Sequence, residues 1–185
     1  MSLSEAAQTD AGGSYLWGRW SGFALFVAAL TCVADQALKF WLLLAAHLAD
    51  AGTIALGPFI DIILVWNTGI SYGLFPQQSP AGVWGLLAFK VAAVALLWAW
   101  LTRVQTRLTA AALGLIIGGA AGNAIDRLHW PGVMDFVLFH IDTAGFTFHW
   151  YVFNLADVAI VAGVVGLLYE SLLGGGAAKA PRSGI

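Results

Sequence analysis

The sequence predicts an all-α membrane protein with a small β element, built on four transmembrane helices. The chain has 185 residues, of which 60% are hydrophobic and only 10% are charged, whereas a soluble domain is usually about 25% charged. Four apolar stretches approach the roughly 20 residues that a membrane-spanning helix needs. The connection at residues 50–79 is instead rich in β-branched and aromatic residues punctuated by Gly and Pro, which predicts two or three short strands.

The four predicted spans cover residues 17–38, 80–101, 108–125 and 152–173. The first is too long for a cleaved signal peptide, and acidic Glu5 and Asp10 precede it. Residues 15–173 are therefore expected to form one membrane domain, while residues 1–14 and 174–185 have the composition of flexible tails.

The basic residues are distributed unevenly between the two sides of these spans. One side holds five of them and the other side holds only Lys39 and Arg127. Because cytoplasmic loops carry the excess of Lys and Arg, we expect both termini in the cytoplasm and the connections 50–79 and 128–151 on the outer face. The five cytoplasmic cations are Arg19, Arg103, Arg107, Lys179 and Arg182.

Several functional classes are disfavoured by the composition. A net charge of −2 without a basic patch argues against nucleic-acid binding. A single cysteine, Cys32, excludes an intrachain disulfide and a cysteine-built metal site. The spacing of His129, His140 and His149 matches no helical ligand pattern. We therefore predict neither a metal nor another cofactor, with a zinc site at these histidines as the minor alternative.

Two aspartates near the outer boundary are candidates for catalysis. Asp157 follows Asn154 by three residues at the start of the last span, and Asp135 lies in the apolar sequence GVMDFVLF. Simpler interpretations are a helix-start acid for Asp157 and a hydrated loop acid for Asp135. The topology nevertheless brings both to one boundary. Two adjacent carboxyl groups cannot both ionise easily, so one can activate water while the other protonates a scissile carbonyl.

The other charged residues near the spans have structural interpretations. Asp35 and Lys39 are spaced for an ion pair within one helix, and Asp126 and Arg127 are expected to form a salt bridge at a helix end. Lys90 interrupts the second span without a functional interpretation. A glycine at every fourth position of the third span predicts close helix packing; these are Gly114, Gly118 and Gly122.

Five motifs together resemble those of the lipoprotein signal peptidase (signal peptidase II) family. They occur in the family's order between residues 35 and 160 and therefore cover the whole membrane core. Tyr72 stands where the family usually has Phe. The motifs are DQALK (35–39), NTGISYGLF (67–75), LIIGGAAGNAIDR (115–127), VMDF (133–136) and FNLADVAI (153–160).

The resemblance implies a function and a set of site residues. Asp135 and Asp157 match the catalytic pair. The substrate-binding positions correspond to Asn67, Asn123, Arg127 and Asn154, and the supporting ones to Asp35, Lys39 and Asp126. The implied fold is four transmembrane helices with a small β-sheet cradle on the outer membrane surface. The implied substrate is a prolipoprotein whose cysteine carries a diacylglyceryl group, cleaved just before that cysteine.

The resemblance also implies an environment and an inhibitor. We expect a monomer in the lipid of a bacterial cytoplasmic membrane, with its active site at the outer face, and inhibition by the cyclic peptide globomycin. A transporter or proton channel that uses the acids as a relay is the competing class. Duplicated halves and broken helix pairs, which that class often has, are not evident in this sequence. A membrane scaffold would leave the gathered acids unexplained.

Overall fold

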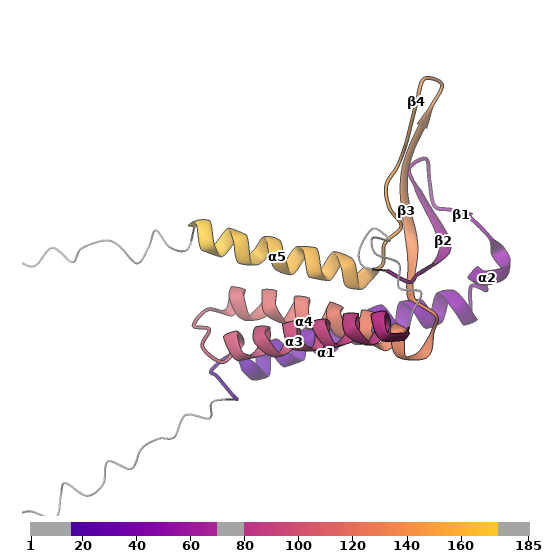
Figure 1. Ribbon diagram of the computed structural model, residues 1–185. Coiled ribbons are helices and arrows are strands. Elements are labelled where there is room, and N and C mark those ends of the chain that lie inside the picture. The colour runs from indigo at the N-terminus through magenta and orange to yellow at the C-terminus, as the bar shows by residue number, and fades with distance from the viewer. Residues whose placement is uncertain (1–15, 70–79, 174–185) are drawn as a thin grey trace, which may run out of the picture.

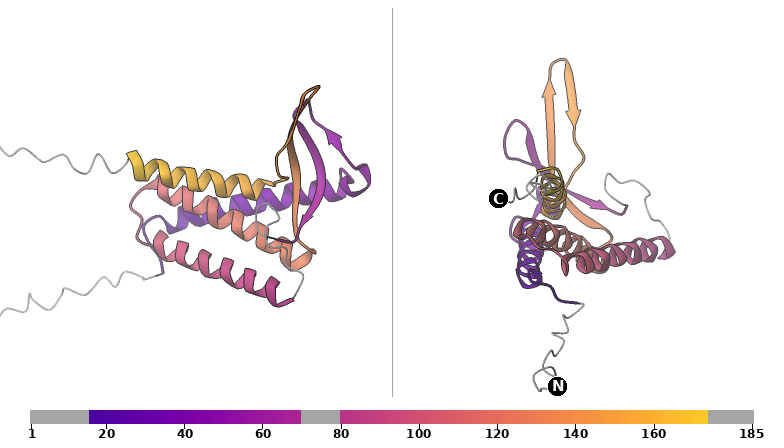
Figure 2. Two further views of the ribbon diagram at one scale, coloured as in Figure 1. Left: turned by 45° about the horizontal axis from the view of Figure 1, so that its top comes forward. Right: turned by 90° about the vertical axis from the view of Figure 1, so that its left-hand side faces the viewer.

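Four long helices lie side by side and a narrow sheet stands at one end of them (Figures 1 and 2). The computed structural model describes residues 16–69 and 80–173. The tails predicted at residues 1–14 and 174–185, and Tyr72, lie outside the described residues, as does the side chain of Lys90. The long helices are α1 (Ser21–Leu44), α3 (Pro80–Leu101), α4 (Arg107–His129) and α5 (Leu155–Leu173).

Successive long helices run in opposite directions (Figure 1). α1 and α4 run toward the sheet, and α3 and α5 run away from it. The start of α1, the end of α5 and the turn between α3 and α4 therefore lie together at the end remote from the sheet (Figures 1 and 2). The connections that carry the polar candidate residues, as far as the structure describes them, lie at the other end of the bundle, beside the sheet.

Small residues allow α4 to pack closely against both α1 and α5. A Cβ atom added at Gly114 would lie 2.7 Å from the carbonyl oxygen of Ala24 in α1. On another side of α4, a Cβ at Gly119 would lie 2.5 Å from the carbonyl oxygen of Ala156 in α5. The close packing predicted from the glycine repeat is confirmed, and α4 is the central helix of the group.

Several helix boundaries differ from the predicted spans: α1 begins at Ser21 and ends at Leu44, α4 ends at His129, and α5 begins at Leu155. α1 continues to Leu44 because the charges of Asp35 and Lys39 are buried against α4 rather than exposed at a helix end. α5 begins only at Leu155 because Asn154 caps it, as described below.

Among the residues that the structure describes, three helices are long and apolar enough to cross a membrane: α1, α4 and α5. In α3, the apolar stretch identified among the described residues is the shorter Val91–Leu101. α5 exposes an apolar surface along its length, which suits contact with lipid rather than with water. This surface includes Val158, Val161, Val164, Val165, Leu168 and Leu172.

The sheet has four antiparallel strands in the order β1-β2-β3-β4. They are β1 (Ile54–Ala55), β2 (Ile60–Asn67), β3 (Val133–Thr143) and β4 (Phe146–His149). The strands predicted in residues 50–79 are confirmed by β1 and β2, whereas β3 and β4 were not predicted individually. Buried apolar side chains join the sheet to the end of α1 and to the short helix α2 (Leu48–Ala51); they are Leu42, Leu48, Ile62, Met134 and Phe136.

Candidate active site

The start of α5 is fixed by a reciprocal capping arrangement. Asn154 Oδ1 accepts a hydrogen bond of 3.0 Å from the backbone N–H of Asp157, and the backbone N–H of Asn154 donates to Asp157 Oδ2 at 3.3 Å. This is a capping box in which Asn and Asp replace the usual Ser and Glu. Asp157 is therefore held in the first turn of α5, where the helix dipole favours negative charge.

Backbone pairing brings this helix start beside Asp135. Phe153 accepts hydrogen bonds from the backbone N–H groups of Phe136 and Val137 and donates one to the carbonyl oxygen of Val137. The residue next to Phe153 is Asn154, and its Nδ2 donates to Asp135 Oδ1 at 2.6 Å. A backbone bridge between β3 and the segment before α5 thus brings Asp135 and Asp157 to the same place, although they lie 22 positions apart in the sequence.

Asp135 is almost completely buried, with 2% of its surface exposed. It accepts a second hydrogen bond, of 3.0 Å, from Asn67 Nδ2 on β2, which pairs with β3. Burial raises the pKa of Asp135 to about 6, and the nearby charge of Asp157 also raises it. The hydrogen bonds from Asn67 and Asn154 oppose this increase because they stabilise the carboxylate.

A chain of amide groups connects the two carboxyl groups. Asn123, on α4, donates from Nδ2 to Asp157 Oδ1 at 3.0 Å. Its Oδ1 accepts from Asn154 Nδ2 at 3.1 Å, and that same nitrogen also donates to Asp135. Since each amide has both a donor and an acceptor in use, the side chains of Asn123 and Asn154 have fixed orientations.

Both carboxyl groups line one cavity of about 150 Å³. Its walls combine polar side chains at the sheet with apolar side chains of α5. A bound peptide could therefore meet the carboxyl groups and an apolar wall together. The lining residues are Asn67, Asn123, Arg127, Val133, Asp135, Tyr151, Val152, Asp157, Ile160 and Val161.

Arg127 does not form the predicted helix-end salt bridge with Asp126. Its guanidinium donates to the carbonyl oxygens of Asn123 at 3.0 Å and Gly69 at 2.7 Å. Asn123 and Arg127, four residues apart on α4, therefore share one face of the helix. Asp126 pairs instead with Lys39, at 2.7 Å, because adjacent residues on a helix point about 100° apart and Asp126 faces α1. Arg127 thus orders the backbone at the rim of the cavity.

The predicted ion pair between Asp35 and Lys39 is present, at 2.7 Å, as part of a larger buried cluster. Asp126 completes it, and the three charged side chains are between 0% and 4% exposed. Asp35 Oδ1 accepts from the backbone N–H of Ala156, and Asp126 Oδ2 accepts from that of Met134, both at 3.0 Å. The cluster therefore fixes α5 next to Asp157 and β3 next to Asp135.

Gln36 belongs to this cluster but was missed in the sequence. Its Nε2 donates to Asp126 Oδ1 at 2.8 Å and to the carbonyl oxygen of Gly122 at 3.1 Å. The available signal was its position, directly after Asp35 and three residues before Lys39. A polar side chain inside a predicted span needs partners within the protein.

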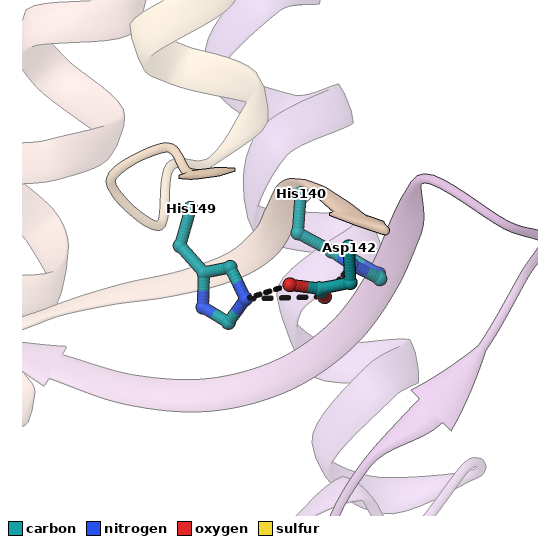
Figure 3. Close-up of side chains that lie close together, drawn as sticks. All are labelled: His140, Asp142 and His149. Atoms are coloured by element: carbon teal, nitrogen blue, oxygen red, sulfur yellow. Dashed lines mark hydrogen bonds and ion pairs between the residues drawn. The ribbon is translucent and has the colours of Figure 1, made fainter. Parts of the chain in front are cut away.

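The three histidines of the second predicted outer connection, residues 128–151, do not all lie together. His140 and His149 come together with Asp142 on the sheet (Figure 3). Nδ1 of His129 lies 2.9 Å from the carbonyl oxygen of Ile125, within α4. The lack of a helical ligand pattern therefore did not exclude a cluster, because antiparallel strands can align residues of unrelated spacing.

An apolar bundle with paired carboxyl groups in a cavity at one end defines a membrane protein with the parts of an aspartic hydrolase. Comparison with known proteins identifies the family. The model of the family "Signal peptidase (SPase) II" matches residues 27–173. The lipoprotein signal peptidase of Nitrobacter hamburgensis is 58% identical over 161 residues, which cover 87% of this chain and 97% of that protein.

A second relative and a solved structure agree with this match. The lipoprotein signal peptidase of Rhodopseudomonas palustris (strain TIE-1) is 54% identical over 157 residues, covering 85% of this chain and 96% of that one. A bacterial membrane enzyme solved at 2.3 Å resolution has a similar fold, with a TM-score of 0.67 and 23% identity over 89% of this chain and 95% of that one. The chain belongs to the signal peptidase II family of aspartic endopeptidases that process lipoproteins. The family predicted from the motifs is confirmed.

Proposed function

We propose that Asp135 and Asp157 are the catalytic dyad of this peptidase. The observation that supports this assignment is that both carboxyl groups line one cavity and both accept hydrogen bonds from Asn154. Asp135 is the proton carrier, since burial raises its pKa to about 6. Asp157, at the positive end of α5, is the base.

The reaction then needs only these two groups and water. Asp157 takes a proton from a water molecule whose oxygen attacks the scissile carbonyl carbon, while Asp135 gives its proton to the carbonyl oxygen. The resulting tetrahedral diol collapses as the C–N bond breaks. Asp157 returns its proton to the leaving nitrogen, and Asp135 recovers a proton from a diol hydroxyl. Both carboxyl groups end in their starting states.

The proposed substrate is a prolipoprotein with a diacylglyceryl group on the cysteine that follows the scissile bond. Val161 lines the cavity and also belongs to the exposed apolar surface of α5, which connects the cavity to the lipid side of the bundle. A diacylglyceryl group partitions into lipid at about 0.8 kcal/mol for each buried methylene. The bilayer thus holds the cysteine at the depth of the dyad, and Asn67 and Arg127 contact the peptide.

The proposal includes the arrangement in a bacterial cytoplasmic membrane. Residues 15–173 form one domain in which α3 spans the membrane in addition to α1, α4 and α5. Both termini are cytoplasmic, and the sheet lies on the outer surface. Arg19 and Arg107 flank the ring of Trp20 at 5.1 and 5.5 Å, at the bundle end remote from the sheet, and this placement supports the orientation. Both carboxyl groups and the amides between them belong to the same chain, which supports a monomer as the active unit.

A cleavage assay with two matched precursors tests this function. Purified enzyme in detergent or lipid should release the signal peptide from the lipid-modified precursor far faster than from the same precursor with an unmodified cysteine. Asp135→Asn and Asp157→Asn should each lower the rate by at least about 10²-fold, because an amide cannot exchange the required protons.

The matched control is Asp50→Asn, which removes an exposed acid of α2 at the same end of the molecule. It should keep the activity of the original enzyme. Near-normal turnover by either dyad variant would refute the assignment of the dyad. Equal rates on both precursors would mean that the lipid is not recognised.

A further inference from the structure

Four ionisable side chains gather on three neighbouring strands of the sheet. His140 and Asp142 are two residues apart on β3 and therefore point to the same face. His149 on β4 is paired directly with His140, so it shares that face. Asp61 on β2 is paired with Leu138, two residues before His140, and its carboxylate reaches the His140 ring. The proposed dyad does not use any of these four groups.

The side chains of His140, Asp142 and His149 converge on one point (Figure 3). One donor atom from each lies within 4.8 Å of the others. Asp142 Oδ2 is 2.8 Å from His140 Nδ1, and His149 Nε2 is 3.2 Å from both carboxylate oxygens. Ligand atoms around a tetrahedral zinc ion lie about 3.4 Å apart, given bonds of 2.0–2.1 Å. The distances from Asp142 to His140 and His149 are within about 0.6 Å of this spacing, and all three donor atoms lie within 4.8 Å of one another, so rotations of these side chains would bring them around such an ion.

The second nitrogen of His140 provides an independent indication. Nε2 is buried and lacks a hydrogen-bond partner among the described residues, although Asp61 Oδ2 lies 3.3 Å away. A histidine that binds a metal through one nitrogen usually donates the N–H of its other nitrogen to a carboxylate. Metal binding at Nδ1 would leave the hydrogen on Nε2, and a small rotation of the Asp61 carboxylate, whose Oδ2 is 3.3 Å away, would let it accept that hydrogen. This arrangement would give a role to His140 Nε2, which is buried and otherwise has no hydrogen-bond partner among the described residues.

We propose that His140, Asp142 and His149 form a zinc site on the hairpin of β3 and β4, with water as the fourth ligand. Two imidazoles and one carboxylate suit Zn²⁺ better than Ca²⁺ or Mg²⁺, which prefer oxygen ligands. Asp142 and His149 are each about half exposed, so the open position faces solvent. His140 is five residues from Asp135, or about 16 Å along an extended strand, so this site is separate from the dyad.

The ion would hold the two strands together immediately before the cavity wall. β4 ends at His149, and Tyr151, which lines the cavity, follows two residues later. The backbone of Trp150 continues the pairing by donating to the carbonyl oxygen of Phe139. A zinc ion bridging β3 and β4 therefore limits separation of the strands where the chain enters the active site.

Zinc titration of the full-length chain tests the proposal, with protein purified without a polyhistidine tag. We expect one Zn²⁺ per chain by calorimetry and by metal analysis after dialysis. His149→Ala should weaken binding by at least about 10²-fold, and Asp61→Asn by about 10- to 100-fold through the second nitrogen of His140. X-ray absorption of the zinc-loaded protein should show histidine nitrogen at 2.0–2.1 Å.

His129→Ala is the matched control, because it removes a histidine outside the cluster. It should bind Zn²⁺ as the original chain does. Retained cleavage activity of His149→Ala would show that this variant is folded, so its loss of zinc would support the site. The proposal is overturned if the original chain and His149→Ala bind Zn²⁺ equally, because the cluster is then a hydrogen-bonded contact between strands.

Discussion

Asp135 is the residue whose ionisation should be visible in both stability and catalysis. A carboxyl group whose pKa rises from 3.8 to about 6 on folding binds its proton more tightly in the folded state. Below about pH 4 the carboxyl is protonated in both states, and the folded protein incurs no ionisation penalty. As pH rises through about 6, the buried group ionises at a cost of about 3 kcal/mol. Stability should therefore fall over this interval.

This prediction is tested by measuring the melting temperatures of the original protein and of Asp135→Asn between pH 4 and 8. The melting temperature of the original protein, relative to the variant, should decrease as pH rises through about 6, because the amide does not titrate. The same proton should appear in kcat/KM as a decline on the alkaline side near pH 6. A constant difference in melting temperature across this range would show that Asp135 titrates normally.

Arg127 and Asp126 show how neighbours in the sequence can have different roles. Arg127 contacts two backbone carbonyl oxygens at the cavity, whereas Asp126 accepts hydrogen bonds from Lys39, Gln36 and the backbone of Met134. A helix turns about 100° per residue, so two consecutive side chains face different surroundings. Their opposite charges suggested a mutual salt bridge, but the helix geometry assigned each to another partner.

At the scale of elements, the buried charge cluster joins α1 to α4. Lys39 Nζ lies 2.7 Å from both Asp35 and Asp126. Removing the cation with Lys39→Met leaves two buried carboxyl groups facing each other without compensation. The expected loss of stability is about 3 to 5 kcal/mol. Thermal unfolding of the purified protein in detergent measures this loss.

A second variant, at the same end of α4, tests whether stability depends on the buried ion cluster itself or on any positive charge in this region. Arg127→Ala should reduce cleavage but lower the melting temperature less than Lys39→Met, because Arg127 contacts backbone carbonyl oxygens. Adding Asp126→Asn to Lys39→Met should recover part of the stability by removing one of the two unpaired carboxylates. If Arg127→Ala proved as destabilising as Lys39→Met, the buried cluster would not be the main connection between the helices.

For the whole molecule, the proposed orientation predicts which ends are accessible from outside the cell. Ala144 lies between β3 and β4, and Gln105 lies between α3 and α4, at the opposite end of the bundle (Figure 1). Both are exposed. In a Cys32→Ala background, a membrane-impermeant thiol reagent added to intact cells should label Ala144→Cys and leave Gln105→Cys unlabelled.

Permeabilised cells provide the control for this experiment, since both cysteines should then react. Labelling of Gln105→Cys alone in intact cells would place the sheet in the cytoplasm. The active site would then face away from secreted precursors, and the proposed role in lipoprotein maturation would be wrong.

The sequence alone determined the class of molecule and much of its chemistry. A chain with 60% hydrophobic residues and four long apolar stretches cannot bury that surface in one aqueous core, so membrane helices follow from composition and length. Asp135 and Asp157 also stood out in their local sequence, because an acid among apolar residues usually has a partner or a function. The ordered motifs then predicted the family, which the comparisons confirm.

Only the tertiary structure decided which of these groups meet. Asp126 pairs with Lys39 across 87 positions, Asn154 links the two proposed catalytic acids, and His140 lies opposite His149. Local sequence records the periodicity of a helix or strand, but such pairs depend on strand register and on the rotation of one helix against another. Those are set by packing between distant segments, such as the glycines of α4 against α1 and α5.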